Sequence, residues 1–399
     1  MRLTHRATMI ACYNGYVTQA ICINFAPLLY LTFQKEFGIS VRDISLLIAV
    51  NFLTQLLIDA LATVFSARLN LRFFAVLAHI ASASGLVGLS FFPKLFPPYI
   101  GLLVSVTLLG IGGGFTEVII SPLMEACPTE GKSASMSFLH SFYCWGQVGV
   151  ILLSGIFFAF FEIQYFWRLL PIFWALIPLF GAVLFSMVPI YSLPTDKNEG
   201  GGAAHIQKLF RMPIFFSFIL MMLCAGASEM TMSQWSSVFA ESALQVPKEL
   251  GDLLGPCMFA LMMGVSRLLY GKFSNRFSLS KMMLFGCIGC LTAYGLAALV
   301  PIPAIALWGC ALCGLSVGMF WPGILSQAAE AIPMGGIPLF SILALAGDIG
   351  CLVGPSAAGG IADAMGGDLR YAFYFAMLFP AVCMGGLLLH RYQRKENEK

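Results

Sequence analysis

The sequence predicts an all-α membrane protein of twelve transmembrane helices in two six-helix pseudo-symmetric halves. Composition, the length of the apolar runs and an internal repeat lead to this prediction. Of the 399 residues, 59% are hydrophobic and only 10% are charged, with a mean hydropathy of +0.87. Soluble domains carry roughly 25% charged residues, so we expect this chain to lie in a lipid bilayer. Its small net charge of +3 is not typical of a nucleic-acid-binding protein.

Twelve apolar runs are long enough to cross a bilayer. A helix spans the hydrocarbon core with about 20 residues, whereas barrel strands would alternate between apolar and polar residues over about ten. The first run is longer than the apolar core of a cleaved signal peptide, which indicates a retained first span. The predicted spans cover residues 7–33, 43–66, 72–92, 98–125, 133–159, 167–190, 213–240, 252–271, 281–300, 303–331, 338–362 and 371–390.

The positions of Lys and Arg predict the orientation of these spans. If the N-terminus is cytoplasmic, sixteen of the 22 basic residues lie on the cytoplasmic side. This asymmetry satisfies the positive-inside bias. We therefore expect a multi-pass protein of the cell (inner) membrane with both termini in the cytoplasm.

A polar segment divides the chain near its midpoint. Residues 192–212 include the three consecutive glycines Gly200–Gly202 and are predicted to form a flexible cytoplasmic linker. This linker joins an N-terminal six-helix half, residues 1–191, to a C-terminal six-helix half, residues 213–399.

The two halves repeat parts of the same sequence. A shift of 205 residues places Gly113 on Gly318 and Glu125 on Glu330. In the next span of each half, the segment that begins at Gly146 falls on the segment that begins at Gly347. Parallel repeats of this kind indicate transport by alternating access around a site at the interface of the halves.

The sequence predicts no cofactor and no metal site. The 12 cysteines lie almost entirely in apolar runs and suggest no disulfide framework. Cys310 and Cys313 have a zinc-like spacing, but within an apolar helix we expect them to pack as small hydrophobic residues. The glycine-rich run Gly110–Gly114 lacks the Lys-Ser/Thr pair of a phosphate-binding loop. An ATP-driven pump is therefore excluded, and the glycines are expected to serve close helix packing.

Glu117 is a carboxylate deep inside an apolar run, Gly110–Gly131. The same run recurs as Gly314–Gly336 without this acid. Ionisable groups at membrane depth are energetically expensive and are usually placed for function. Apolar surroundings favour the neutral form of an acid, which a proton carrier needs, so Glu117 is the leading candidate for proton coupling. The alternative is a buried acid that a neighbouring helix satisfies.

The twelve spans, the six-plus-six repeat and the central linker together resemble the major facilitator superfamily over essentially the whole chain. The loop Gly271–Arg276 is similar to the superfamily's Gly-x-x-x-Asp-Arg loop, with Asn275 in place of the aspartate. The equivalent loop after span two keeps its basic residues but lacks the glycine and the aspartate, which puts its gating contacts in doubt. We expect gating roles for Arg68, Arg72, Glu125, Arg267, Asn275, Arg276 and Glu330.

Within the superfamily, the chain resembles the fucose/galactose/gluconate:proton symporter group. Three short motifs carry this resemblance: Glu117 followed by Pro122, the segment Leu139–Phe142, and Glu229 followed by Trp235. The resemblance implies that Glu117 takes part in proton coupling. Glu229 and Trp235 suit a cavity for a hydroxylated ring, because the carboxylate binds hydroxyls and the indole offers a flat apolar face.

Span one departs from the pattern of this group. The symporters carry an aspartate a few residues before a proline, whereas this chain has Asn24 before Pro27. Proton coupling is therefore expected to involve Glu117 alone or Glu229 as well.

Spans one, four, seven and ten line the central cavity in this superfamily, and spans five and eleven flank it. We expect the solute to contact polar and aromatic side chains of these spans. They are Asn14, Gln19, Asn24, Glu117, His140, Gln147, Glu229, Trp235, Trp321 and Asp348. Pro322 and Gly323, which follow Trp321, also predict a bend in span ten.

Several of these residues have a structural alternative. Glu229 could bond to span one, Trp321 could pack against lipid, and His140 could pack in the core. Asp59 in span two is expected to pair with Arg68 or Arg72.

The sequence thus predicts a secondary active transporter, driven by protons, for a small neutral polar solute such as a sugar or sugar-like molecule. The absence of Lys and Arg at mid-span disfavours an anionic solute. Proton-coupled efflux of amphipathic compounds is an alternative that the 35 Phe and 20 Met residues would tolerate, and a non-transporting membrane sensor is another. We expect a monomer that is no enzyme, with the solute, the proton and the lipid bilayer as partners and no nucleic acid.

Overall fold

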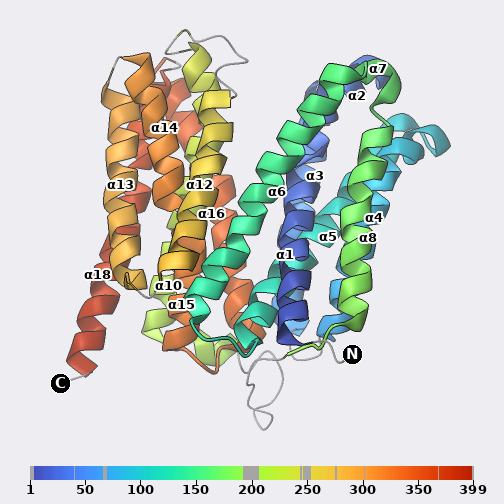
Figure 1. Cartoon of the computed structure of the whole chain (residues 1–399). Coiled ribbons are helices and arrows are strands. Elements are labelled where there is room, and N and C mark those ends of the chain that lie inside the picture. Colours follow the sequence, from blue (N-terminus) through green and yellow to red (C-terminus); the bar gives the residue numbers. More distant parts are fainter. Residues whose placement is uncertain are drawn as a thin grey trace. The chain divides into compact units, whose positions relative to one another are not determined.

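The described part of the chain is helical throughout and holds no strand in the computed structural model (Figure 1). It comprises residues 4–39, 41–65, 70–191, 206–242, 245, 253–274, 276–300, 302–366 and 368–397. The prediction of an all-α protein is confirmed for these residues. Two residues with expected gating roles, Arg68 and Asn275, lie outside them.

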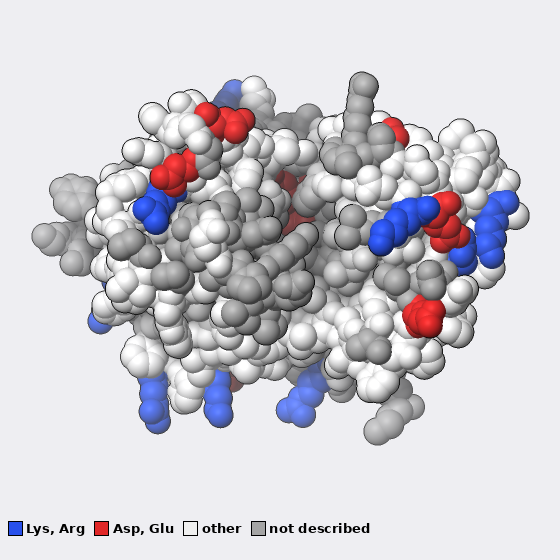
Figure 2. All heavy atoms as spheres, turned by 90° about the horizontal axis from the view of Figure 1, so that it is seen from above, with Lys and Arg blue, Asp and Glu red and all other residues white. Residues whose placement is uncertain are grey.

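Ten helices of the described residues are long and apolar enough to cross a membrane. The first two predicted spans are not among the ten, although both fall on helical residues; the second contains a shorter apolar helix, Leu46–Ala62. The count of twelve spans therefore stays a prediction. Lys, Arg, Asp and Glu cover only a small part of the face shown in Figure 2. This agrees with the low charge of the sequence.

The chain packs into two compact units, which we describe separately. Unit 1 consists of Met1–Pro128, Phe142–Gly202 and Gly336–Ser341. Unit 2 consists of Thr129–Ser141, Ala203–Gly335 and Ile342–Lys399. Most of the predicted linker lies outside the described residues, so the domain boundaries expected from the sequence stay a prediction.

In unit 1, helix α5 packs against α1, α3 and α4, and α8 packs against α1 and α4. The first predicted span is interrupted after Asn24 by a short 3-10 helix, whose Pro27 cannot donate a backbone hydrogen bond. The helices of this unit are α1 His5–Asn24, η1 Ala26–Leu29, α2 Tyr30–Phe37, α3 Val41–Phe65, α4 Leu71–Leu95, α5 Pro98–Ala126, α7 Ile163–Phe166, α8 Leu169–Met187 and, from Phe142 onward, α6 Lys132–Phe160.

Glycines of α5 bring its backbone into contact with two neighbouring helices. A Cβ atom on Gly110 would lie 2.8 Å from the carbonyl oxygen of Asn51 in α3, and one on Gly112 would lie 2.8 Å from that of Ala78 in α4. No side chain larger than hydrogen fits at these positions without moving a helix. The prediction that this glycine run serves helix packing is confirmed.

In unit 2, α14 packs against α12 and α13, while α10 packs against α14, α15 and α18. The helices of this unit are α10 Pro213–Ser242, η3 Leu253–Cys257, α12 Met258–Phe273, α13 Leu279–Leu299, α14 Pro303–Val317, α15 Phe320–Ala331, α17 Leu369–Ala376, α18 Leu378–Asn397 and, from Ile342 onward, α16 Gly336–Ala364. The tenth predicted span is broken between α14 and α15. The break lies just before Pro322, and the predicted interruption is confirmed.

Helices α10 and α16 of unit 2 touch through their backbones. A Cβ atom on Gly350 would lie 2.0 Å from the carbonyl oxygen of Leu223, a distance at which the two helices would have to separate. We expect Gly350→Ala to lower the free energy of unfolding by about 1–3 kcal/mol, as overpacking of a core does. Denaturant unfolding in detergent, followed by circular dichroism, measures this change.

Gly360→Ala is the matched control for this substitution. Gly360 lies in the same helix, and a Cβ atom there would meet nothing within 4 Å. Equal stability of the two variants would contradict close α10–α16 packing.

Candidate functional site

Helices α1 and α5 of unit 1 bring together two residues that the sequence places in the solute site. The side-chain amide of Gln19 donates from Nε2 to Oε2 of Glu117 over 2.7 Å. Gln19 is 4% exposed and Glu117 is half-buried. The other amide atom of Gln19, Oε1, is buried and accepts no hydrogen bond from any described residue. A donor on a bound molecule would satisfy this oxygen.

A second layer of polar contacts lies one turn away on the same two helices. The hydroxyl groups of Tyr16 and Ser121 are 2.7 Å apart and hydrogen-bond to each other. Residues three or four positions apart share a helix face, so Tyr16 and Gln19 lie on one face of α1, and Ser121 and Glu117 on one face of α5. The α1–α5 contact is therefore polar over about two turns.

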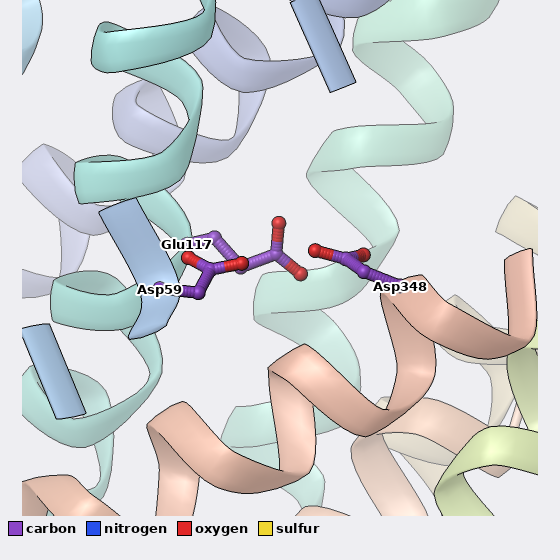
Figure 3. A group of neighbouring side chains, drawn as sticks. All are labelled: Asp59, Glu117 and Asp348. Atoms are coloured by element: carbon purple, nitrogen blue, oxygen red, sulfur yellow. The ribbon is translucent and has the colours of Figure 1, made fainter. Parts of the chain in front are cut away.

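Asp59 of α3 places a second carboxylate beside Glu117. Oxygen atoms of the two groups lie within 4.8 Å of each other, and Asp59 is completely buried (Figure 3). Two negative charges this close in a medium of low dielectric constant repel each other strongly. Uptake of a proton or another cation by the pair would relieve this repulsion. Figure 3 also labels Asp348, which belongs to unit 2.

Of the two expected partners of Asp59, Arg68 lies outside the described residues, and Arg72 bonds elsewhere. The guanidinium group of Arg72 instead donates to three backbone carbonyl groups at the end of α8, those of Phe185, Ser186 and Val188, over 3.1, 2.6 and 2.9 Å. The last carbonyl groups of a helix have no partner within it, so a cationic donor is favourable there. Arg72 thus ties the start of α4 to the end of α8. Its gating role stays a prediction.

Replacing Arg72 should destabilise this connection. We expect Arg72→Ala to lower the free energy of unfolding by about 2 kcal/mol, because hydrogen bonds from a charged donor are lost and helix-end carbonyl groups lose their partners. The same denaturant titration in detergent applies. Arg211→Ala, at an exposed position, is the control, and an equal loss in both variants would contradict the clamp role.

Two other residues of α1 expected to bind solute point elsewhere. Asn14 donates from Nδ2 to the carbonyl oxygen of Ile177 in α8, over 3.3 Å. Asn24 donates to Ala20 in its own helix, over 2.9 Å. The structure does not bring these two amides to Glu117, and their proposed contact with solute stays a prediction.

Unit 2 contains a buried ion pair between two residues that the sequence had assigned to different roles. Nη2 of Arg267 in α12 lies 3.5 Å from Oε2 of Glu229 in α10, and the two side chains are 3% and 12% exposed. The sequence placed Arg267 with the gating residues and Glu229 with the proton-coupling residues. The partner of Glu229 in this unit is therefore an arginine of α12, a candidate that the sequence did not suggest.

The proline at the α14–α15 break leaves a backbone carbonyl group to which Arg267 donates. Pro322 has no backbone N–H, so it cannot donate to the carbonyl oxygen of Gly318, four residues earlier. That oxygen instead accepts a 2.8 Å hydrogen bond from Nε of Arg267. Nη1 of Arg267 also donates to the carbonyl oxygen of His140, over 3.1 Å. One guanidinium group thus holds the broken helix, α6 and Glu229 together.

The two tryptophans expected in the solute site both contact α16. Trp235 donates from Nε1 to the carbonyl oxygen of Pro355 over 3.0 Å. The ring of Trp321 lies against Gly347, where an added Cβ atom would meet ring carbon Cη2 at 2.4 Å. The buried N–H of Trp321 finds no acceptor among the described residues. The ring of Trp321 therefore packs on a helix of its own unit, and the lipid-packing alternative loses support.

The other predicted residues are spread over the two units. His140 is buried and Gln147 is half-buried in α6, and Asp348 is half-buried in α16. Near the helix ends, Glu125 is half-buried in α5 and Glu330 is exposed in α15. Arg276 is exposed after α12, with its guanidinium carbon 6.0 Å from the ring centre of Phe273. Their binding and gating roles stay predictions.

A charged cluster in unit 1 was not found from the sequence. Glu36 of α2 forms an ion pair with Arg168 and accepts a 2.7 Å hydrogen bond from Nε1 of Trp167. The guanidinium carbon of Arg168 lies 4.5 Å from the centre of the Trp167 ring. The Trp-Arg pair at the start of the sixth predicted span is the one sequence signal that could have drawn attention to it.

Long apolar helices with paired buried charges define a multi-pass helical membrane protein. The chain belongs to the Major Facilitator Superfamily, whose family model matches residues 7–337. This confirms the superfamily predicted from the sequence.

Individual relatives are similar only at low identity. The membrane protein MosC of Rhizobium meliloti is 24% identical over 352 residues, which cover 88% of this chain and 82% of MosC. A crystal structure of the transporter FucP in the outward conformation has a TM-score of 0.81 at 14% identity, covering 96% of this chain and 98% of that one. The structure of the proton:xylose symporter XylE bound to 6-bromo-6-deoxy-D-glucose has a TM-score of 0.79 at 12% identity, covering 96% and 94%. These structures share the fold of this chain.

Proposed function

We propose that this protein is a secondary active transporter that uses a proton gradient to move a small neutral polar solute, a sugar or sugar-like molecule. The observation that carries the proposal is the group formed by Gln19, Glu117 and Asp59 in unit 1. Two similar structures, at low identity, are described as a fucose:proton and a proton:xylose symporter, which agrees with this choice. Alternating access of the two halves is part of the proposal.

The donors and acceptors of this group favour a solute that carries hydroxyl groups. Oε1 of Gln19 is a buried acceptor, and the carboxylate of Glu117 beside it is an acceptor when ionised. A hydroxyl group can donate to either atom. Leaving such an acceptor buried without a donor costs roughly 1–3 kcal/mol, so a hydroxylated solute gains affinity over an apolar one.

The same group supplies a site for the coupling proton. Asp59 and Glu117 in their ionised forms would place two like charges within 4.8 Å of each other in the membrane. Uptake of one proton removes this repulsion, and loss of the proton restores it. The free energy of the pair therefore depends on the proton that the transporter is proposed to carry.

The charges of unit 2 also favour a neutral solute. The sequence predicts no cationic residue at mid-span, and Arg267, toward the end of the candidate span Leu254–Phe273, is buried. Its charge faces Glu229 and two backbone carbonyl groups. An anionic solute would have to compete with these partners. Trp235 and Trp321 are proposed to offer flat apolar faces to a sugar ring.

The proposal includes the expected topology. It comprises twelve spans in the cell (inner) membrane, cytoplasmic termini, two halves that meet at residues 192–212, and a monomeric state. The charge bias of the sequence agrees with the orientation, and the internal repeat agrees with the two halves. Cysteine labelling from either side of intact vesicles, at positions near Lys197 and near Lys94, tests the orientation.

Uptake into proteoliposomes with an imposed pH gradient tests the function. We expect at least one sugar or polyol of a panel to accumulate above its external concentration, and to do so only while the gradient is present. A protonophore is the control. Uptake that ignores the gradient would contradict proton coupling, and the absence of counterflow for every hydroxylated solute would contradict the solute class.

Efflux of amphipathic compounds is a second candidate, favoured by one cavity. Unit 2 has a cavity of about 230 Å³ near the start of α14, lined by Leu254, Met258, Ala304, Leu307, Trp308 and Ala311. These residues are apolar, and Trp308 is 70% exposed on the outside of the unit. Proton-driven extrusion of a fluorescent amphipathic cation from the same proteoliposomes would support this function over the first.

A further inference from the structure

Two helices of unit 2 each carry a pair of cysteines three residues apart. Cys287 and Cys290 lie on α13, and Cys310 and Cys313 lie on α14. In the structure, Sγ of Cys290 lies 3.8 Å from Sγ of Cys313, and neither residue is exposed. All four are free thiols.

The other two cysteines, Cys287 and Cys310, lie away from the Cys290–Cys313 sulfur pair because of the register of the two helices. Helices α13 and α14 follow each other directly and therefore run antiparallel (Figure 1). Three residues along a helix rise by about 4.5 Å. Because Cys287 and Cys310 precede Cys290 and Cys313 on antiparallel helices, they lie on opposite sides of the pair. No third His, Cys, Asp or Glu of the described residues brings a ligand atom within 4.8 Å of both sulfurs.

Close backbone packing fixes the separation and register of the two helices around the sulfur pair. On one side of the pair, a Cβ atom on Gly286 would lie 2.6 Å from the carbonyl oxygen of Ser316. On the other side, a Cβ atom on Gly309 would lie 2.8 Å from the carbonyl oxygen of Ala293. Glycines thus bring α13 and α14 into contact on both sides of the pair, and the thiols stay opposite each other.

We propose that Cys290 and Cys313 form a two-coordinate site for a soft metal ion. Thiolate ligands select soft ions. Two metal–sulfur bonds of about 2.3 Å span about 4.6 Å when collinear, so the 3.8 Å pair needs only small side-chain rotations. Zn²⁺ is disfavoured because its structural sites are four-coordinate and the described residues supply no third ligand.

The apolar surroundings favour a divalent soft ion such as Hg²⁺. Two thiolates and one divalent ion form a neutral complex, whereas a monovalent ion would leave a net negative charge in the membrane, which is costly. With HgCl₂, two S–H bonds break, two Hg–S bonds form, and two chlorides leave with the two protons. Sulfur and mercury keep their oxidation states, so the step needs no oxidant or reductant.

The site borders the charged group of unit 2. Tyr294, one turn beyond Cys290, donates from its hydroxyl to the carbonyl oxygen of Ser228 over 2.7 Å, and Ser228 precedes Glu229. A metal bridge would therefore join α13 and α14 beside α10, the helix that carries Glu229, the partner of Arg267.

Retention of mercury by the purified full-length protein tests the site. The protein in detergent is treated with HgCl₂ and then washed with excess 2-mercaptoethanol, which removes mercury held by one thiol more readily than mercury held by two. Wild type and Cys310→Ala are expected to retain one more mercury ion per chain than Cys290→Ala and Cys313→Ala. Cys310 is the matched control because it lies one turn away on α14 and is equally buried. Equal retention in all four proteins would overturn the proposal.

A second measurement uses wild type alone and does not depend on the folding of a variant. Proteolysis of the mercury-loaded protein, followed by mass spectrometry, should yield a mercury-bridged peptide pair containing Cys290 and Cys313. Bridges that join only other cysteines, or no bridge, would overturn the assignment. Neither experiment depends on transport, so the site and the proposed function can fail independently.

Discussion

Arg267→Met is expected to lower the free energy of unfolding by about 3–5 kcal/mol, as the loss of one partner of a buried ion pair does. The substitution leaves the carboxylate of Glu229 buried without its cation. It also removes the donor for the carbonyl oxygen of Gly318, which Pro322 cannot satisfy. Denaturant unfolding of the purified protein in detergent, followed by circular dichroism, measures the change.

The double variant Arg267→Met with Glu229→Gln separates the charge effect from the loss of hydrogen bonds. Because both charges are removed together, we expect it to be more stable than Arg267→Met alone. Lys272→Met, an exposed position on the same helix, is the control and should change the stability by no more than about 0.5 kcal/mol. If the double variant is no more stable than Arg267→Met alone, the loss of stability does not come from the uncompensated charge of Glu229.

Some features of this fold follow from local sequence, and the structure confirms them. The break in the tenth predicted span follows from Pro322, because a proline in the interior of a helix removes a backbone hydrogen bond. The packing role of Gly110 and Gly112 follows from their occurrence within an apolar run. These features depend on residues that are close together in the chain.

The contacts of the candidate site depend on residues far apart in the chain. Gly114 of α5 packs against Ile58 of α3, with the nearest atom 2.9 Å from a Cβ built on the glycine. This contact turns the next residue of α3, Asp59, toward the helix face that carries Glu117. Apolar periodicity gives neither the pairing of α3 with α5 nor their rotation. From the sequence, we expected Asp59 to pair with a nearby arginine, Arg68 or Arg72, and did not expect Glu117 beside it.

The pairing of Arg267 with Glu229 likewise could not be predicted from the sequence. Each residue was singled out from its own motif, one near a loop and the other within a span. Their pairing depends on α12 and α10 both lying against the α14–α15 segment. A single sequence does not contain that information, because short motifs describe neighbours in the chain and not neighbours in space.

We expect the second large effect from substitutions in the carboxylate pair of unit 1, Asp59 and Glu117. Asp59→Asn is expected to abolish proton-driven accumulation of the solute, which should then reach only equal concentrations inside and outside the vesicles. Glu117→Gln is expected to do the same. Each substitution removes one of the two like charges of this pair, so the repulsion that would drive uptake of a proton is lowered. Solute counterflow without a gradient should persist in Asp59→Asn, because Asp59 is not the residue that contacts Gln19.

Stability measurements distinguish this role from a structural one. Removing one of two carboxylates that lie within 4.8 Å of each other relieves repulsion in the ionised state, so neither variant should unfold more readily than wild type at neutral pH. Asp363→Asn, at an exposed carboxylate of α16, is the control and should leave accumulation unchanged. Full accumulation in Asp59→Asn would remove that residue from proton coupling. Loss of counterflow together with accumulation would instead assign Asp59 to solute binding, because a residue needed only for the proton is not needed for exchange.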